Sequence, residues 1–319
     1  MKQQKQSAPT TLSGLWTNSD GPLAITQYKD YVQLSDGIGT LHSDGWIHAL
    51  FPGNWQGRVK PTDNPNVLFW DDNGGTWNRL RDVTGHWKTP TNTIELAQHK
   101  GSVLGENLTG KLHQRCISIQ RSGISMTGEL SFDDRFILWE TGEKWKRTLN
   151  TNGKWVVAQN QPTIKSIPGT GVKKGTQLLL QQTSQGIISS KQINIDDHFS
   201  VNGKFFDNSL TITGNFPFGL GLGWLEHTSF ALQWHANRFN RVIDLTGNWL
   251  DRNSNAIHEI TQLTPDPIKE PSIGTLTING NTNGRVNRNW VSTSDNNGIV
   301  DATTNTIHFD NGDCWARSR

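Results

Sequence analysis

Val67 to Arg79, VLFWDDNGGTWNR, carries a pattern that returns three more times along the chain. An apolar residue, a spacer and an aromatic lead into a short turn bearing Gly or Asn, and another aromatic, one spacer and an Arg follow. The other copies are Ile137 to Arg147 (ILWETGEKWKR), Leu232 to Arg241 (LQWHANRFNR) and Ile307 to Arg317 (IHFDNGDCWAR). Four copies at similar spacing predict a repeat protein.

Each copy is expected to form a β-hairpin. In each copy, two short runs with a two-residue alternation of side chains flank a turn rich in Asp, Asn and Gly, which are residues that tolerate positive φ. The aromatic residues of the two runs would then face each other across the ladder, where such pairs contribute roughly 0.2 to 1 kcal/mol. The expected pairs are Trp70 with Trp77, Trp139 with Trp145, Trp234 with Phe239, and Phe309 with Trp315.

A Gly, a spacer and a Trp open each repeat, at Gly14, Gly85, Gly153 and Gly247. The strand that follows ends in Gln in three copies, which are LAITQ from Leu23, IELAQ from Ile94 and IHEITQ from Ile257. Helical periodicity is almost absent, since Gly or Pro interrupts nearly every long window. We therefore predict a disordered tail at 1–12 and four units of about five to seven strands, at 13–82, 83–150, 151–244 and 245–319.

The opening Gly-x-Trp and the closing Arg of each unit resemble a pair found in lipocalin-like barrels, in which the Arg lies over the Trp at the closed end. An Arg over an indole is a cation–π contact worth about 0.5 to 2 kcal/mol. The units also resemble the tandem tryptophan-bracketed β-repeats of uncharacterised microbial and algal proteins. Neither resemblance implies a reaction.

We predict an all-β protein of four tandem antiparallel β-meander repeats. The preferred arrangement is two pairs of repeats, each pair closing a lipocalin- or avidin-like barrel of about ten to twelve strands. A four-bladed β-propeller is the main alternative, because four-fold repetition suits it and a blade needs fewer strands.

Composition excludes several classes of partner. The net charge is +2, from 30 basic and 28 acidic residues, which predicts no binding of nucleic acid or of an anionic membrane. The polar start MKQQKQSAPTT and the lack of a long apolar run predict neither a signal peptide nor membrane insertion. Cys116 and Cys314 occupy non-equivalent positions, which argues against a disulfide framework and favours a cytoplasmic location.

Signatures of catalysis and of metal binding are few. The sequence has no His-Glu-x-x-His, no Cys pair at metal-ligand spacing and no Gly-x-Ser-x-Gly, so we expect no metal and no cofactor. The enlarged third repeat is where an added function is expected, and there Asp196, Asp197 and His198 could do acid–base work. Under this alternative the protein is an isomerase or cyclase acting on a small apolar molecule in a barrel cavity.

The third repeat also holds a glycine-rich stretch, FPFGLGLGW from Phe216. We interpret it as a glycine-kinked strand in the core. A lid or a contact surface for a ligand or a partner is the alternative. A further alternative for the function is a scaffold or interaction module in a larger assembly that uses this stretch.

Fourteen Trp residues suggest the leading functional hypothesis. Ten belong to the repeated framework and are expected in the core. The four outside it are Trp46, Trp55, Trp224 and Trp290. Among polar neighbours, an indole is a flat apolar surface on which a sugar ring can stack, while Asp, Asn and His side chains bond the hydroxyl groups. We therefore predict a soluble carbohydrate-binding, lectin-like protein with repeated, partly degenerate sites.

Overall fold

The computed structural model describes the chain from residue 12 to residue 318, apart from residues 13, 19–20, 29, 35–37, 43–45, 51–55, 62–65, 71–74, 132–133, 149, 161–174, 184–186, 193–201, 206–210, 217–218, 226–230, 235–236 and 302. Every regular element in this part is a β-strand. The described residues contain no helix that is long and apolar enough to cross a membrane.

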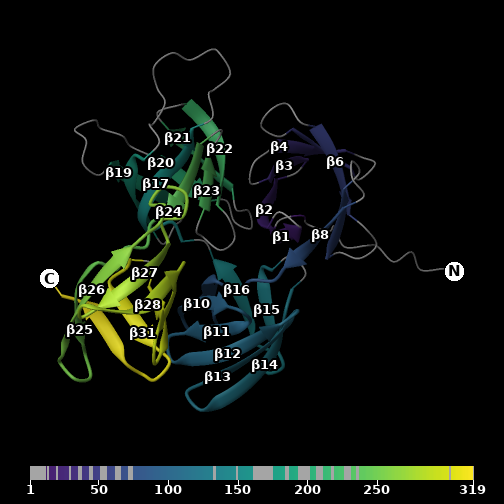
Figure 1. Cartoon of the computed structure of the whole chain (residues 1–319). Helices are drawn as coiled ribbons and strands as arrows, with labels where there is room; N and C mark the ends of the chain where they lie inside the picture. Colours follow the sequence, from purple (N-terminus) through teal and green to yellow (C-terminus); the bar gives the residue numbers. More distant parts are fainter. Residues whose placement is uncertain are drawn as a thin grey trace.

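Each repeat closes its own eight-stranded antiparallel barrel (Figure 1). Barrel 1 consists of β1 (Gly14–Asn18), β2 (Gly21–Tyr28), β3 (Tyr31–Leu34), β4 (Ile38–Leu41), β5 (Ile47–Leu50), β6 (Gln56–Pro61), β7 (Val67–Trp70) and β8 (Thr76–Leu80). Barrel 2 consists of β9 (Gly85–Lys88), β10 (Thr93–His99), β11 (Ser102–Gly105), β12 (Leu108–His113), β13 (Cys116–Arg121), β14 (Ile124–Leu130), β15 (Phe136–Trp139) and β16 (Lys144–Thr148).

The third and fourth repeats follow the same up-and-down order. Barrel 3 consists of β17 (Gly153–Asn160), β18 (Gln177–Gln182), β19 (Ile187–Gln192), β20 (Asn202–Phe205), β21 (Thr211–Phe216), β22 (Gly219–Leu225), β23 (Ala231–Trp234) and β24 (Asn237–Arg241). Barrel 4 consists of β25 (Gly247–Asp251), β26 (Ile257–Leu263), β27 (Ile273–Ile278), β28 (Asn281–Asn287), β29 (Trp290–Thr293), β30 (Asn297–Val300), β31 (Thr306–Phe309) and β32 (Cys314–Arg317).

The prediction of an all-β chain of antiparallel barrels is confirmed. The preferred arrangement has two repeats in each barrel, whereas in the structure a single repeat supplies all eight strands of a barrel. The cause is that the first strand of every repeat pairs with the last strand of the same repeat. A propeller blade is an open sheet, so these closed barrels are not blades.

A Trp, a Gln and an Arg, here called the closing cluster, seal one end of each barrel. The Arg lies directly opposite the opening Trp where the first and last strands pair. The guanidinium carbon lies over the indole at 4.4 Å for Arg79 and Trp16, 4.3 Å for Arg147 and Trp87, 5.0 Å for Arg241 and Trp155, and 4.7 Å for Arg317 and Trp249. The expected contact of Arg over Trp is confirmed in all four repeats.

The Trp and the Gln of the closing cluster bind the chain just before the first strand. In barrel 2 the Trp87 indole N–H donates to the Val83 carbonyl at 2.7 Å, and the Gln98 side-chain oxygen accepts the Val83 N–H at 3.0 Å. The same two bonds recur at Leu12, Thr151 and Leu245 in the other barrels. The segment that enters each barrel is therefore fixed at the sealed end, with its polar backbone groups paired.

The Arg of the closing cluster also binds backbone carbonyl groups. Arg147 donates from Nε to Asp134 at 2.8 Å, from Nη1 to Thr84 at 2.6 Å and from Nη2 to Asp82 at 2.5 Å. Arg317 makes three equivalent bonds in barrel 4. A guanidinium carries five N–H donors in one rigid plane, and a Lys ammonium cannot reproduce this geometry.

The Gly of each Gly-x-Trp motif has a conformational reason. Gly85, Gly153 and Gly247 have φ angles of 121°, 120° and 134°. Residues with a side chain rarely adopt this backbone conformation. The turn into the first strand thus requires Gly in barrels 2, 3 and 4, which explains why the motif opens these three repeats.

The closing hairpins place aromatic rings inside the barrels. Trp139 and Trp145 meet edge to face with ring centroids 4.6 Å apart, and Phe309 and Trp315 do so at 4.8 Å. These two predicted pairs are confirmed. The other two pairs include side chains outside the described part, those of Trp70 and Trp234.

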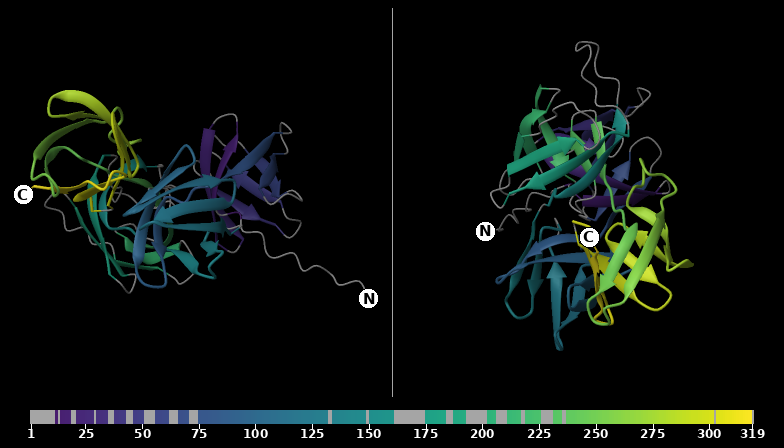
Figure 2. Two further views of the ribbon diagram at one scale, coloured as in Figure 1. Left: turned by 90° about the horizontal axis from the view of Figure 1, so that it is seen from below. Right: turned by 90° about the vertical axis from the view of Figure 1, so that its left-hand side faces the viewer.

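Barrels 2 and 4 pack side by side, although barrel 3 separates them in the sequence (Figures 1 and 2). Strands β10 and β11 contact β29 and β30. The Asn289 side-chain amide donates to the Glu95 carboxylate and to the Leu96 carbonyl, both at 3.1 Å. An apolar cluster completes the contact, formed by Ala97, Leu104, Trp290 and Ile299.

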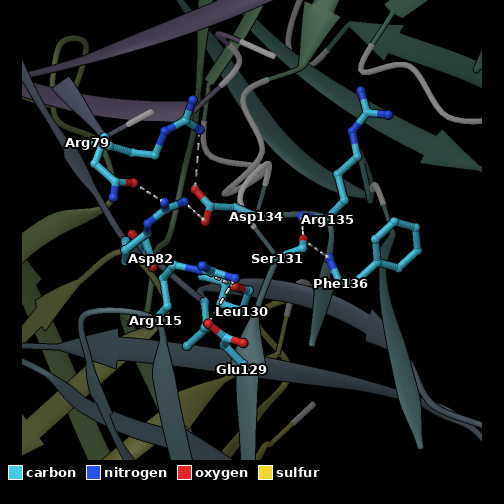
Figure 3. Close-up of polar contacts among 12 residues, drawn as sticks. Arg79, Asp82, Arg115, Glu129, Leu130, Ser131, Asp134, Arg135 and Phe136 are labelled. Atoms are coloured by element: carbon cyan, nitrogen blue, oxygen red, sulfur yellow. Dashed lines mark hydrogen bonds and ion pairs between the residues drawn. The ribbon is translucent and has the colours of Figure 1, made fainter. Parts of the chain in front are cut away.

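A buried carboxylate joins barrels 1 and 2. Asp134, between β14 and β15, accepts a hydrogen bond from Arg81 at 2.5 Å and lies 3.9 Å from Arg79 (Figure 3). Arg79 is the closing Arg of barrel 1, so the sealed end of that barrel is tied to a loop of the next. Burial raises the pKa of Asp134, and the guanidinium groups of Arg81 and Arg79 oppose this effect.

Three further predictions can be compared with the structure. Residues 1–11 of the predicted tail lie outside the described residues, but Leu12 is buried in the core of barrel 1, so its assignment to the tail is wrong. Residues 219–224 of the glycine-rich stretch belong to β22, which confirms the strand in that part, whereas their side chains lie outside the described residues, so their place in the core stays a prediction. Cys116 and Cys314 are both free thiols.

Arg147→Lys tests the role of the closing cluster. The substitution keeps the charge but leaves buried carbonyl groups without donors, so we expect barrel 2 to lose about 2 to 4 kcal/mol of stability. Native-state hydrogen exchange of β9 and β16 measures this local free energy of opening. Arg285→Lys, at an exposed arginine of β28, is the control and should change stability by less than about 0.5 kcal/mol. Equal effects of the two substitutions would contradict the assignment.

Candidate ligand-binding site at the mouth of barrel 4

The residues singled out from the sequence do not meet in one described place. Asp196, Asp197 and His198 lie outside the described residues, and so does Trp55. The backbone of Trp224 belongs to β22, but its side chain lies outside the described part. The acid–base alternative in the third repeat therefore stays a prediction.

Trp46 and Trp290 are placed in different barrels. Trp46 is half-buried between β4 and β5, and its carbonyl accepts the His42 N–H at 2.8 Å. Trp290 is only 5% exposed, because Ala97 and Leu104 of barrel 2 pack against it. The expectation that polar neighbours leave the Trp290 indole open to a ligand is therefore wrong, and this residue has a packing role.

The end of barrel 4 that lies opposite its closing cluster is called the mouth here. The connections β25–β26, β27–β28, β29–β30 and β31–β32 surround it. It holds a cavity of about 290 Å³, close to the size at which small-molecule sites begin. The polar part of the lining includes Asn279, Asn281, Asn283, Thr293, Asp295 and Asn296.

One wall of the cavity is aromatic. The His258 ring stacks on the Trp315 ring, with centroids 4.0 Å apart and planes inclined by only 11°. Phe309 meets Trp315 edge to face at 4.8 Å. Trp315 is half-buried, so the neighbouring rings fix its orientation while it still lines the cavity.

Hydrogen bonds hold the polar side of the mouth in place. The Thr293 hydroxyl accepts the Asn296 N–H at 3.0 Å and the Asp295 N–H at 3.3 Å. The Asn279 side-chain oxygen accepts a backbone N–H of β26 at 2.9 Å, and its amide nitrogen lies 3.2 Å from Nδ1 of His258. The turns that carry the lining are thus ordered before any ligand binds, which reduces the entropy cost of binding.

Strand register shows which residues of barrel 2 are equivalent to those of the mouth. His258 lies opposite Trp249 in barrel 4, and Ile94 lies opposite Trp87 in barrel 2. Because these Trp residues open their repeats, Ile94 is the counterpart of His258. Ile94 is buried in the core of barrel 2.

Two more positions show the same change from apolar to polar. Gly284 of barrel 4 is equivalent to Gly110 of barrel 2. Gly284 pairs with Thr293, whereas Gly110 pairs with Ile119. Asn281 occupies the place of Leu108, at the start of the fourth strand. Leu108 and Ile119 are buried in the core of barrel 2. Apolar side chains therefore fill the mouth of barrel 2, and polar side chains line a cavity in barrel 4.

Asn283 is an additional residue in barrel 4. The register of β27 and β28 shifts after Leu276, so Asn283 has no pairing partner in β27. The corresponding strands β11 and β12 pair without a shift. A β-bulge of this kind changes the direction of nearby side chains, and here it adds an amide to the cavity lining.

The aromatic wall carries an unmet hydrogen-bond donor. The Trp315 indole N–H is buried and has no acceptor among the described residues. In barrel 2 the equivalent Trp145 donates to the Glu143 carboxylate at 3.1 Å. Barrel 4 has the shorter Asp313 at that position, and its carboxylate accepts from the Asn311 amide at 2.7 Å. Barrels 2 and 4 thus differ in the hydrogen bonding of this Trp as well as in the side chains at the mouth.

A second polar cluster lies where the barrels meet. His86 of β9 lies 2.8 Å from the Asn150 amide and 3.7 Å from the Glu95 carboxylate. Burial, together with the positive charges of Arg241 and Arg147, lowers the pKa of His86 to about 3. Glu95 favours the protonated imidazole, but burial and the two guanidinium groups outweigh it. The imidazole is therefore neutral at physiological pH, and the cluster connects the barrels.

A metal site requires several ligating side chains close together. The described residues include no group of three or more His, Cys, Asp or Glu side chains placed to hold a metal ion. The mouth of barrel 4 is lined mainly by amide, hydroxyl and aromatic groups. Its chemistry is that of hydrogen bonding and stacking.

Comparison with known proteins does not assign a family. Neither a protein-family model nor a curated protein matches this sequence. The resemblance to lipocalin- and avidin-like barrels therefore stays an expectation.

The sequence did contain a signal for this site. The residue opposite the opening Trp is apolar in the first three barrels and is His in the fourth. These residues are Leu23, Ile94, Leu178 and His258. The candidate Trp residues predicted from the sequence lie outside the repeated framework, whereas Trp315, which lines the cavity, belongs to it.

The pH dependence of stability tests the environment of His86. The unfolded chain protonates this residue near its ordinary pKa of about 6.5, whereas the folded chain does so only at about 3. The unfolded state therefore binds the proton first, and the free energy of unfolding should fall as the pH decreases from about 6.5 toward 3.

Urea unfolding at pH 7, 6 and 5 of the natural chain and of His86→Gln provides the measurement. Between pH 7 and pH 5 the natural chain should lose about 1 to 2 kcal/mol more than the variant. The variant is its own control for the carboxylates, which titrate in both proteins. Parallel pH profiles would show that His86 is not held neutral.

Proposed function

We propose that this chain is a lectin-like carbohydrate-binding protein and that the mouth of barrel 4 is its sugar site. The observation that carries the proposal is the stacked wall of His258 and Trp315 beside amide and hydroxyl side chains in a cavity of about 290 Å³. A cavity of this size suits one monosaccharide unit or the end of a longer glycan.

The chemistry of a sugar fits both sides of this cavity. The flat C–H face of a pyranose is apolar and can pack on an indole ring. Its hydroxyl groups both donate and accept hydrogen bonds, and an Asn side chain does the same. Asn281, Asn283 and Asn296 supply such groups in the lining. The abundance of amides makes the mouth less suited to an apolar ligand.

The proposed sugar site is in barrel 4 alone, and the four barrels do not carry four equal sites. Barrel 2 has the same closing cluster, but its mouth is filled by Ile94, Leu108 and Ile119. A repeated fold therefore does not imply a repeated site. Weak binding is expected, because a single site gains nothing from avidity, which requires several linked sites.

The test is to fill the mouth of barrel 4 with the residues that barrel 2 uses. Isothermal calorimetry of a panel of methyl glycosides at millimolar concentration should detect binding by the natural chain. In the double variant His258→Ile, Thr293→Ile the affinity should fall by at least about tenfold, which corresponds to 1.4 kcal/mol. The barrel should remain folded, because the same residues pack in barrel 2.

Glu259→Gln is the matched control, because Glu259 adjoins His258 in β26 but is exposed and does not line the cavity. It should bind sugars as the natural chain does. The proposal fails if no glycoside binds at millimolar concentration. It also fails if the double variant binds as tightly as the control.

A further inference from the structure

Acidic side chains outnumber basic ones in the mouth of barrel 4. Two carboxylates line the cavity, those of Asp295 and Asp313, and the lining contains no Lys or Arg. His258 is the one side chain in the lining that can carry a positive charge, and it is stacked on Trp315. A ligand in this cavity therefore meets a negative local field.

The two carboxylates differ in how they are engaged. Asp313 accepts hydrogen bonds from the side-chain amides of Asn311 at 2.7 Å and Asn253 at 3.1 Å. Asp295 accepts a bond from the neighbouring Ser294 hydroxyl at 2.9 Å, and it is exposed. None of these partners is a cation, so neither negative charge is neutralised by them. Asp295 is the freer of the two to meet a ligand.

We infer that the sugar site selects amino sugars and rejects acidic ones. This inference rests on the proposed function and specifies its ligand class. A protonated amine on the sugar ring donates charge-assisted hydrogen bonds to Asp295 or Asp313, which are stronger than bonds between neutral groups. A uronic acid would place a third carboxylate beside these two, where like charges repel.

The inference is tested with three sugars of the same ring: glucosamine with its amine protonated, glucose, and glucuronate. Calorimetry at low ionic strength should give the tightest binding for glucosamine and the weakest for glucuronate. The two affinities should differ by at least about tenfold. Added salt should reduce this difference, because it screens exposed charges.

Asp295→Asn and Asp313→Asn should each reduce the ratio of the glucosamine affinity to the glucuronate affinity. Glu270→Gln, at an exposed residue between β26 and β27 near the closed end of barrel 4, removes the same charge away from the mouth and should leave the ratio unchanged. If glucuronate binds as tightly as glucosamine, or if the two Asn variants leave the ratio unchanged, the inference is overturned while the sugar site stands. If none of the three sugars binds, the inference is overturned as well, and binding in the panel of methyl glycosides decides whether the sugar site stands.

Discussion

An arginine held between an indole and backbone carbonyl groups is the contact on which every barrel depends. Arg147 and Arg317 each donate three hydrogen bonds to carbonyl groups and cover the Trp that opens their repeat. Since the Arg is in the last strand and the Trp in the first, the contact joins the two ends of one repeat. A closed barrel has no free edge strands, so repeats can follow one another in a chain without pairing edge to edge.

A sealed end leaves the opposite end free to change. In barrel 2 the mouth is packed with aliphatic side chains, and the barrel is a filled structural unit. In barrel 4 three of the same positions are His258, Asn281 and Thr293, and a cavity is present. An eight-stranded barrel is just wide enough either to be filled by its own side chains or to hold one small ligand. A few substitutions at one end therefore suffice to convert a structural unit into a candidate binding site.

The sequence predicted what is local and repeated, and it failed where distant units meet. Gly-x-Trp and the closing Arg were visible because positive φ at Gly85 and the contact of Arg over Trp impose the same residues in every repeat. Pairing of whole repeats could not be read from spacing, since the register that joins first to last strand appears only in three dimensions. Trp290 has polar sequence neighbours, but barrel 2 covers it. The mouth required comparison of equivalent positions, where His258 replaces an aliphatic residue.

The claim that function resides in one mouth, and not in the repeat as such, can be tested within one molecule. The most direct measurement is hydrogen–deuterium exchange of the full chain with and without a saturating methyl glycoside that binds. We predict slower exchange at residues 278–283 and 293–296 around the mouth of barrel 4, with no change at the equivalent residues 105–109 and 119–126 of barrel 2. Equal protection of both mouths, or protection elsewhere only, would contradict this account.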